Sequence, residues 1–321
     1  MVDETPPLFI LTGPTACGKT GAGVELALRL GTEIISADSV QVYKYFDIGS
    51  AKPSPEQLAM VSHHLVGVAQ PEEEFNAARF RDEALAIASS LWAEGKLPLV
   101  VGGTGLYIKA ITQGLNLAGQ IGEEAEAELE RLWNLGGQKL LYEKLQKDDP
   151  EWAARIHPND TFRTRRGVGV LLTTGRRMSQ IFSANPDKPA RHVLTLVMDI
   201  PKDILRKRIT ARVEEMMSKG WTEELNMLKE MGYNMAHKPM RAIGYKEMFA
   251  VHQGTMDPLD VKEAIVRGTW ALARRQLTWW RSVKDSVIVS LDGEETAAMT
   301  AEVILSRDEV RKYFSLHGVK A

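Results

Sequence analysis

Short apolar runs alternate with helical patterns along much of the chain. Mainly apolar runs at 8–11, 32–36, 97–101 and 192–200 predict strands that are buried on both faces, as in a parallel sheet. Apolar residues three and four positions apart over 76–94 predict an amphipathic helix. Strands that alternate with helices in this way indicate an α/β fold.

The pattern changes from about residue 115. Residues 122–149 are rich in Glu and Lys, and Gly136–Gly137 divides them into two predicted helices. A linker at 185–189 precedes the return of the strand pattern. We therefore predict a core in two parts, 1–114 and 191–321, with a small all-helical domain inserted at 115–190. The second core part is predicted to hold helices over 201–217 and 260–283, a helix ending at Met231, a strand over 287–291 and a terminal helix.

Composition narrows the class of protein. The 321 residues are 44% hydrophobic and 26% charged, as in a soluble globular protein. The net charge of −2 excludes a global basic field, so a nucleic acid would be bound through local basic patches. The single cysteine excludes an internal disulfide and favours a cytoplasmic location. No stretch approaches the ~20 apolar residues of a membrane span, so no membrane partner is expected.

The first strand leads directly into a G-x-x-x-x-G-K-T motif. Its glycines let the backbone curl so that N–H groups point at an anion, and the following helix directs its positive end to the same place. The sequence therefore predicts a P-loop NTPase-like parallel sheet flanked by helices, with a bound phosphate or diphosphate. The predicted diphosphate-binding residues are Gly13, Pro14, Thr15, Ala16, Cys17, Gly18, Lys19 and Thr20, and the Thr20 hydroxyl is the predicted ligand of Mg²⁺.

Two further strand ends are predicted to face the same crevice. Asp38 follows the strand at 32–36, although the pattern equally allows this Asp to cap the next turn. The strand at 97–101 ends in Gly102, where an ordinary P-loop ATPase would carry a Walker-B Asp for Mg²⁺, which argues against a plain ATPase. His63–His64 is not expected to bind a metal, because neighbouring residues of a strand face opposite sides.

Basic residues gather in the second half of the predicted insert. They lie in a span that is nearly free of acids, which favours contact with phosphates, while a solvated face with a few ion pairs is the alternative. They are Arg155, His157, Arg163, Arg165, Arg166, Arg176 and Arg177. The helix over 260–283 adds arginines beside tryptophans, a combination that suits nucleic acid.

Six motifs together resemble one family. GPTACGKT, ADSVQVY, IGSAKP, VGGTGLYIKA, RAIGYKE and ARRQLTWWR occur in this order between residues 8 and 283, and they resemble the tRNA dimethylallyltransferases, also called tRNA isopentenyltransferases, of the bacterial type. Three positions differ from the family pattern. Cys17 stands where the family usually has Ser, 119–130 is Glu-rich where the family offers an arginine, and Arg166-Gly167-Val168-Gly169 replaces an acidic run.

The resemblance implies an enzyme that moves a dimethylallyl group from dimethylallyl diphosphate to the exocyclic amine of an adenine. That adenine lies 3′-adjacent to the anticodon in tRNAs reading UNN codons, and Mg²⁺ assists. The implied catalytic residues are Asp38 as general base, with Lys19, Thr20 and Arg212 on the leaving diphosphate. The implied tRNA contacts are Asp38, Ser39, Val40, Gln41, Thr104, Phe162, Arg163, Thr164, Arg165, Arg166, Arg241, Ala242, Ile243, Gly244, Tyr245, Lys246 and Glu247.

The implied partners are the anticodon stem-loop, clamped by the insert, and dimethylallyl diphosphate, with the protein acting as a monomer.

Other functions share parts of this sequence pattern. An adenylate dimethylallyltransferase would use the same loop and base on a free nucleotide but would need no basic insert. A small-molecule P-loop kinase and an RNA-binding module with a vestigial loop are the remaining alternatives.

Overall fold

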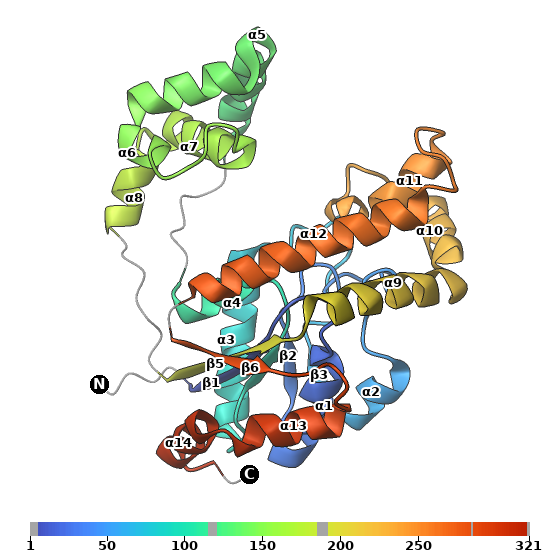
Figure 1. The fold of residues 1–321 in the computed structure, drawn as a ribbon. Coiled ribbons are helices and arrows are strands. Elements are labelled where there is room, and N and C mark those ends of the chain that lie inside the picture. The colour runs from blue at the N-terminus through green and yellow to red at the C-terminus, as the bar shows by residue number, and fades with distance from the viewer. Residues whose placement is uncertain (1–5, 115–120, 185–191, 284, 320–321) are drawn as a thin grey trace. The chain divides into compact units, whose positions relative to one another are not determined.

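The computed structural model describes residues 6–114, 121–184, 192–283 and 285–319 (Figure 1). The chain divides into two compact units. The first unit, the core, comprises Met1–Thr112 and Ala190–Ala321, and the second unit comprises Gln113–Pro189. We describe each unit by itself.

Six strands of the described core form one sheet in the order β3-β2-β4-β1-β5-β6, and every pairing is parallel. The strands are β1 (Leu8–Thr12), β2 (Ile34–Ser36), β3 (His63–His64), β4 (Leu99–Val101), β5 (Val193–Asp199) and β6 (Ser286–Ser290). The predicted α/β fold with a parallel sheet is confirmed, and the five predicted strands end within two residues of the observed ends. All carboxyl ends of these strands lie at one edge, where ligands bind in such sheets.

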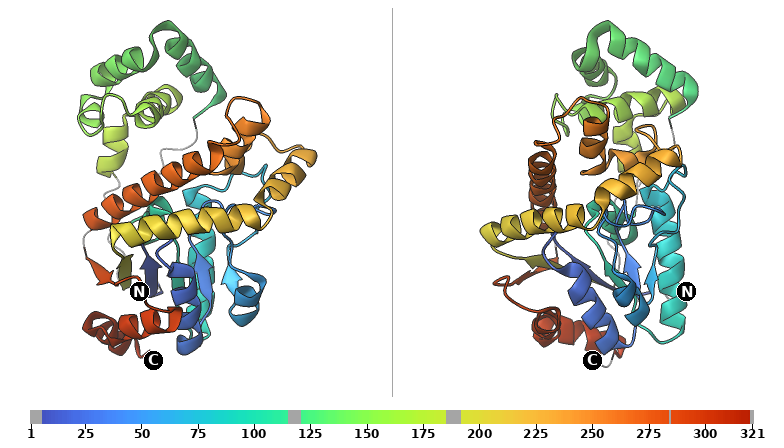
Figure 2. Two further views of the ribbon diagram at one scale, coloured as in Figure 1. Left: turned by 45° about the vertical axis from the view of Figure 1, so that its right-hand side comes forward. Right: turned by 90° about the vertical axis from the view of Figure 1, so that its right-hand side faces the viewer.

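Helices connect and cover the strands (Figure 2). Those of the core are α1 (Lys19–Leu30), α2 (Pro55–Met60), α3 (Ala77–Ala93), α4 (Gly105–Thr112), α9 (Lys202–Ser218), α10 (Trp221–Glu230), α11 (Tyr245–His252), α12 (Val261–Ser282), α13 (Ala297–Ser306) and α14 (Asp308–His317), with a 3₁₀ helix at Lys238–Arg241. The prediction of a single terminal helix is wrong. Arg307 has extended backbone angles (φ −70°, ψ 140°), which end α13 and allow α14 to begin in a new direction.

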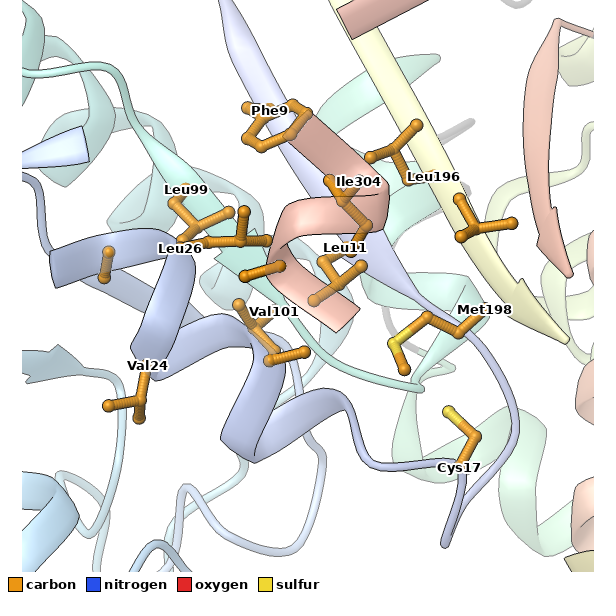
Figure 3. Close-up of a cluster of buried hydrophobic side chains, with 14 of the residues drawn as sticks. Phe9, Leu11, Cys17, Val24, Leu26, Leu99, Val101, Leu196, Met198 and Ile304 are labelled. Carbon is orange, nitrogen blue, oxygen red and sulfur yellow. The ribbon is translucent and has the colours of Figure 1, made fainter. Parts of the chain in front are cut away.

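The central strand β1 anchors the hydrophobic core. Phe9 and Leu11, two residues apart, point to one face of the sheet, and both side chains are fully buried. Figure 3 shows them beside Leu99 of β4 and Leu196 of β5, with Ile304 of α13 covering the same face. A strand held by two parallel neighbours and a packed face gives the loop that follows it a rigid base.

The second unit is a bundle of helices with its own core. Its elements are α5 (Glu123–Asp148), α6 (Pro150–Ala153), α7 (Thr161–Thr174) and α8 (Met178–Ala184). The predicted division of α5 appears as a kink at Gly137, whose backbone angles are non-helical (φ 59°, ψ −150°). A Cβ on Gly169 of α7 would lie 2.5 Å from Ile121 Cδ1, and one on Gly167 would lie 2.8 Å from Leu145 Cδ1. The departure at 166–169 therefore lets α7 approach α5 closely.

A substitution at Gly102, the residue after β4, tests how closely the backbone segments pack at the carboxyl ends of the strands. A Cβ there would overlap the backbone oxygen of Ala37, which cannot rotate away as a side chain could. We expect Gly102→Ala to lower the free energy of unfolding by roughly 3 kcal/mol, the upper range of overpacking costs, measured by urea denaturation. Gly95→Ala is the control: it has φ +76° and no atom within 4 Å of the new Cβ, so it should cost about 1 kcal/mol. Equal losses would contradict this account.

Candidate active site

The loop after β1 has the backbone geometry that an anion site needs. Gly13 has φ +147°, and a Cβ there would lie 2.6 Å from the Met198 carbonyl oxygen of β5. Gly18 has φ +102° and precedes α1 directly, while Ala16 is also left-handed at φ +65°. The two motif glycines therefore serve backbone shape and close approach, and the N-terminus of α1 brings its partial positive charge to the loop.

Basic side chains close around this loop. The Lys19 ammonium donates to the carbonyl oxygens of Gly13 (3.0 Å) and Pro14 (2.6 Å). Arg208 of α9 donates from Nη1 to the Cys17 carbonyl (3.2 Å) and from Nη2 to the Gly293 carbonyl (2.6 Å). Arg208 was outside the predicted site, although it lies one helical turn from Arg212 on the same face of α9. It holds the loop through the Cys17 carbonyl and adds positive charge to the cleft that it lines.

Arg212 differs from Arg208 because its charge has little compensation. Its guanidinium is partly buried, and among the described residues it makes one hydrogen bond, a long one of 3.4 Å from Nη1 to Thr15 Oγ1. Burial lowers the pKa of Arg212, while the Asp38 carboxylate acts in the opposite direction. A guanidinium offers five N–H donors, so Arg212 retains the capacity to bind an anionic ligand.

Asp38 caps the turn after β2 and also faces the cleft, so both positions that the sequence allowed are combined in one side chain. Its Oδ1 accepts hydrogen bonds from the backbone N–H groups of Val40 (2.8 Å) and Gln41 (3.1 Å), so the carboxylate caps the turn after β2. The same side chain lines the cleft above the P-loop. Within the described residues Oδ2 receives no hydrogen bond, which leaves it available to accept a proton from a ligand.

Two cavities meet at this point. The first has a volume of about 560 Å³ and is lined by Lys19 and Thr20. The second has a volume of about 320 Å³ and is bounded largely by apolar side chains of α9, α10 and α12. Both cavities are lined by Thr15, Asp38, Ser50 and Arg212. A phosphate-binding cleft and an apolar cavity therefore share a carboxylate and a guanidinium at their junction.

Gln276 of α12 was missed as a site residue, although it lies within the motif ARRQLTWWR. Its Oε1 accepts the backbone N–H of Thr15 (2.8 Å) and its Nε2 donates to the Gly103 carbonyl (2.9 Å). A Cβ on Gly103 would lie 2.5 Å from this nitrogen. The glycine pair after β4 was the signal that a distant segment approaches the backbone closely there.

The predicted residues 38–41 and Thr104 come together in the core. Thr104 Oγ1 accepts the Ser39 N–H (3.1 Å), which joins the turn after β2 to the turn after β4. Gln41 Nε2 donates to the carbonyl oxygens of Ser50 (3.2 Å) and Ala51 (2.8 Å). This hydrogen bonding ties the Asp38 turn to the loop that carries the IGSAKP motif.

The segment Arg241–Glu247 has two kinds of residue. Arg241, Ala242 and Ile243 line the second cavity, and Lys246 is exposed. Tyr245 is fully buried, and its hydroxyl donates to Glu224 Oε1 at 2.6 Å. The structure therefore places Tyr245 in the interior, behind the surface that its neighbours form.

The predicted residues of the second unit are also of two kinds. Phe162 is 80% exposed at the start of α7, while Thr164 is fully buried. Arg163 forms an ion pair with Asp160. Arg165 Nη2 lies 2.7 Å from both Glu126 Oε1 and Glu130 Oε1.

In this structure Arg163 and Arg165 are therefore paired with carboxylates, as expected for the alternative of a solvated face with a few ion pairs. The guanidinium of Arg165 also lies over the Trp133 ring, 5.9 Å from its centroid. The glutamates of the 119–130 stretch, where the family offers an arginine, supply both partners of Arg165. Arg166 lies on the same helix α7.

Fold and site together define a P-loop α/β protein whose cleft combines a glycine loop with positive φ angles, the N-terminus of α1 and basic side chains. The family model "IPP transferase" matches residues 41–283, and the model "Isopentenyl transferase" matches residues 6–67. The chain belongs to the IPP transferase family. No helix in the part of the chain that the structure describes combines the length and apolar character of a membrane span.

Individual relatives agree with this family. A tRNA dimethylallyltransferase of Geobacter sulfurreducens is 41% identical over 283 residues, which cover 88% of this chain and 90% of the relative. A tRNA isopentenylpyrophosphate transferase of Bacillus halodurans has a similar structure, with a TM-score of 0.71, 33% identity and coverage of 97% and 99% of the two chains. A eukaryotic dimethylallyltransferase acting on tRNA gives a TM-score of 0.79 at 25% identity, with coverage of 96% and 80%.

Gln276 is expected to matter for diphosphate binding. Gln276→Met keeps the side-chain volume but removes both hydrogen bonds, which releases the Thr15 backbone from its position. We expect the binding free energy of inorganic diphosphate to weaken by about 1.4 kcal/mol, a typical net contribution of a hydrogen bond. Isothermal titration calorimetry should then give a Kd that is roughly tenfold higher. Thr278→Val is the control, because that exposed hydroxyl bonds only within α12, to the Arg274 carbonyl. An unchanged Kd in Gln276→Met would show that Gln276 does not contribute to diphosphate binding.

Proposed function

We propose that this protein is a tRNA dimethylallyltransferase. It transfers the dimethylallyl group of dimethylallyl diphosphate to the exocyclic amine of the adenine 3′-adjacent to the anticodon in tRNAs reading UNN codons. The observation that carries the proposal is the junction of the two cavities, where Asp38 and Arg212 both face the P-loop cleft and the apolar cavity. A donor and an acceptor that enter from the two cavities would meet between a base and a cation.

The reaction separates charge, and the site is built to stabilise it. The C1–O bond of the donor breaks and its electron pair leaves with the diphosphate, where Lys19, the loop N–H groups and Arg212 stabilise the growing negative charge. The adenine amine forms the new N–C bond. Its lone pair is delocalised into the ring, so it is a weak nucleophile, and Asp38 accepts its proton.

The second cavity suits the flat apolar faces of an adenine. Val213, Met216, Trp221, Ile265 and Leu272 line it together with Asp38. A base in the anticodon loop reaches such a cavity only after it is flipped out of the stack, at a cost of a few kcal/mol. Burial against these side chains offsets part of that cost.

The side chains of the first cavity fit a magnesium ion that is shared with the diphosphate. The Thr20 hydroxyl lines that cavity. Among the described residues there is no group of three or more His, Cys, Asp or Glu side chains that could hold a metal by themselves. Mg²⁺ commonly binds through one or two protein groups, substrate phosphates and water, so Thr20 and the diphosphate would hold it. The ion would neutralise part of the diphosphate charge.

The insert is the proposed tRNA-binding domain, through Phe162, Arg163, Arg165 and Arg166. Its exposed Phe162 ring can stack on a base, and Arg163 and Arg165 can exchange their carboxylate partners for phosphates. The monomeric state and the cytoplasmic location stay predictions.

A transfer assay separates the proposed function from its nearest alternative. Radiolabelled dimethylallyl diphosphate is offered with Mg²⁺ to unmodified tRNA, an anticodon stem-loop and free AMP. Label on tRNA and stem-loop but not on AMP is the expected result. Label on AMP alone would make the protein a free-nucleotide prenyltransferase, and ATP consumption without label would favour a kinase.

Asp38→Asn tests the base directly. The amide oxygen of Asn can still accept the N–H groups of Val40 and Gln41, so the turn is kept while the proton acceptor is lost. We expect kcat to fall by about 10²- to 10⁴-fold, the usual contribution of a general base, with tRNA affinity within a few-fold. Asp82→Asn, an exposed carboxylate paired with Arg81, is the control and should leave kcat unchanged. Weaker tRNA binding at normal kcat would contradict the assignment.

Arg165→Ala tests the insert. We expect a higher KM for tRNA and a slope of log affinity against log salt that is shallower by about 1, because one phosphate contact is lost. Arg131→Ala, which removes an exposed arginine paired with Glu128 on α5, is the matched control and should leave the slope unchanged. Identical slopes in wild type and Arg165→Ala would exclude Arg165 from the interface.

A further inference from the structure

One buried carboxylate outside the reaction site contacts two segments that line the second cavity. Glu224 of α10 is 8% exposed. Its Oε2 accepts the backbone N–H groups of Asp47 (2.9 Å) and Ile48 (2.6 Å), and its Oε1 accepts the N–H of Gly49 (3.2 Å). Three consecutive N–H groups that point at one carboxylate fix the shape of a loop that has no regular secondary structure of its own.

The fourth partner of this carboxylate comes from another segment. The Tyr245 hydroxyl donates to Glu224 Oε1 at 2.6 Å. Burial, followed by the neighbouring Glu224 carboxylate, raises the pKa of the Tyr245 phenol, so this group stays protonated and donates. All four partners of Glu224 are donors, as a carboxylate requires.

Packing reinforces the same connection one turn earlier on α10. Trp221 is 1% exposed and lies between two glycines, since a Cβ on either Gly49 or Gly244 would overlap its indole ring. Gly49 belongs to the loop that Glu224 holds, and Gly244 precedes Tyr245. Helix α10 therefore joins these two segments by a hydrogen-bonded carboxylate and by a clamped ring.

The loop leads from Glu224 back to the reaction site. Ser50, the residue after Gly49, lines both cavities. The Ser50 carbonyl accepts the Gln41 amide (3.2 Å), and the Gln41 backbone N–H binds Asp38 Oδ1 (3.1 Å). Two hydrogen bonds, both made by Gln41, thus connect the loop to Asp38.

We propose that Glu224 is a positioning residue that sets the loop 47–50 and, through Tyr245, the segment 241–247, so that Asp38 and the walls of the second cavity keep their reactive arrangement. This inference rests on the proposed function. It assigns to Glu224 no contact with substrate: its effect reaches the reaction through the backbone of the loop and through Gln41.

Glu224→Gln is the principal variant. Gln keeps the size of Glu but has one acceptor oxygen in place of two, so at least one of the three backbone N–H groups of 47–49 loses its acceptor and the loop is loosened. We expect kcat with tRNA to fall about tenfold to a hundredfold, as small misplacements of reacting groups do, in protein that remains folded at the assay temperature. Hydrogen exchange at the freed backbone amides of 47–49 should become at least about tenfold faster, because opening the loop to solvent then costs less free energy. Glu223→Gln, an exposed neighbour on α10, is the matched control for both measurements.

Tyr245→Phe separates the two connections and serves if Glu224→Gln does not fold. It removes only the hydroxyl, so the amides of 47–49 should stay protected while KM for tRNA rises. Normal kcat in folded Glu224→Gln, unchanged exchange at 47–49, or an unchanged KM in Tyr245→Phe would each overturn the inference. Wild-type protein that labels no tRNA would overturn the proposed function instead, and the exchange measurement would still report whether Glu224 holds the loop.

Discussion

The conformation of the loop from Gly13 to Gly18 is the constraint on which the rest of the site depends. Backbone N–H groups bind an anion only when several of them converge, and a chain of L-residues reaches that shape at a cost. The structure meets this cost from outside the loop. Met198 of β5 packs against Gly13, Arg208 of α9 holds the Cys17 carbonyl, and Gln276 of α12 holds the Thr15 N–H. These contacts join segments that are up to 261 residues apart in the sequence.

Positive charge is distributed unevenly around this loop, and under the proposed function this distribution serves the reaction. Arg208 is engaged with two backbone carbonyls, while Arg212 makes one long hydrogen bond within the described residues and faces Asp38 across the junction of the cavities. A cation that is already desolvated and in place needs little rearrangement when negative charge develops on a leaving group. Within the described residues Asp38 forms no ion pair with Arg212, and its Oδ1 accepts the N–H groups of Val40 and Gln41.

The insert follows a different principle. Arg163 and Arg165 are held by carboxylates of the insert itself, Arg163 by Asp160 and Arg165 by Glu126 and Glu130. Solvent-exposed ion pairs contribute little to stability, so such arginines can change partners at small cost. A net charge of −2 for the whole chain is compatible with RNA binding under the proposed function, because the relevant charge is local.

The sequence by itself determined the parallel sheet, the long helices of the core and the family, but not the division of the C-terminal segment into two helices. Strand and helix positions followed from hydrophobic period, the P-loop from its spacing, and Asp38 from its place after a strand, because these signals are local. Arg208, Gln276 and Glu224 lay outside the predicted site, since a single Arg, Gln or Glu on a helix does not by itself show what it contacts. Tyr245 likewise belonged to a recognised motif, yet only the fold placed it inside, bonded to Glu224. Tertiary structure alone decides such roles, because they arise where α9, α10 and α12 meet loops that are distant in sequence.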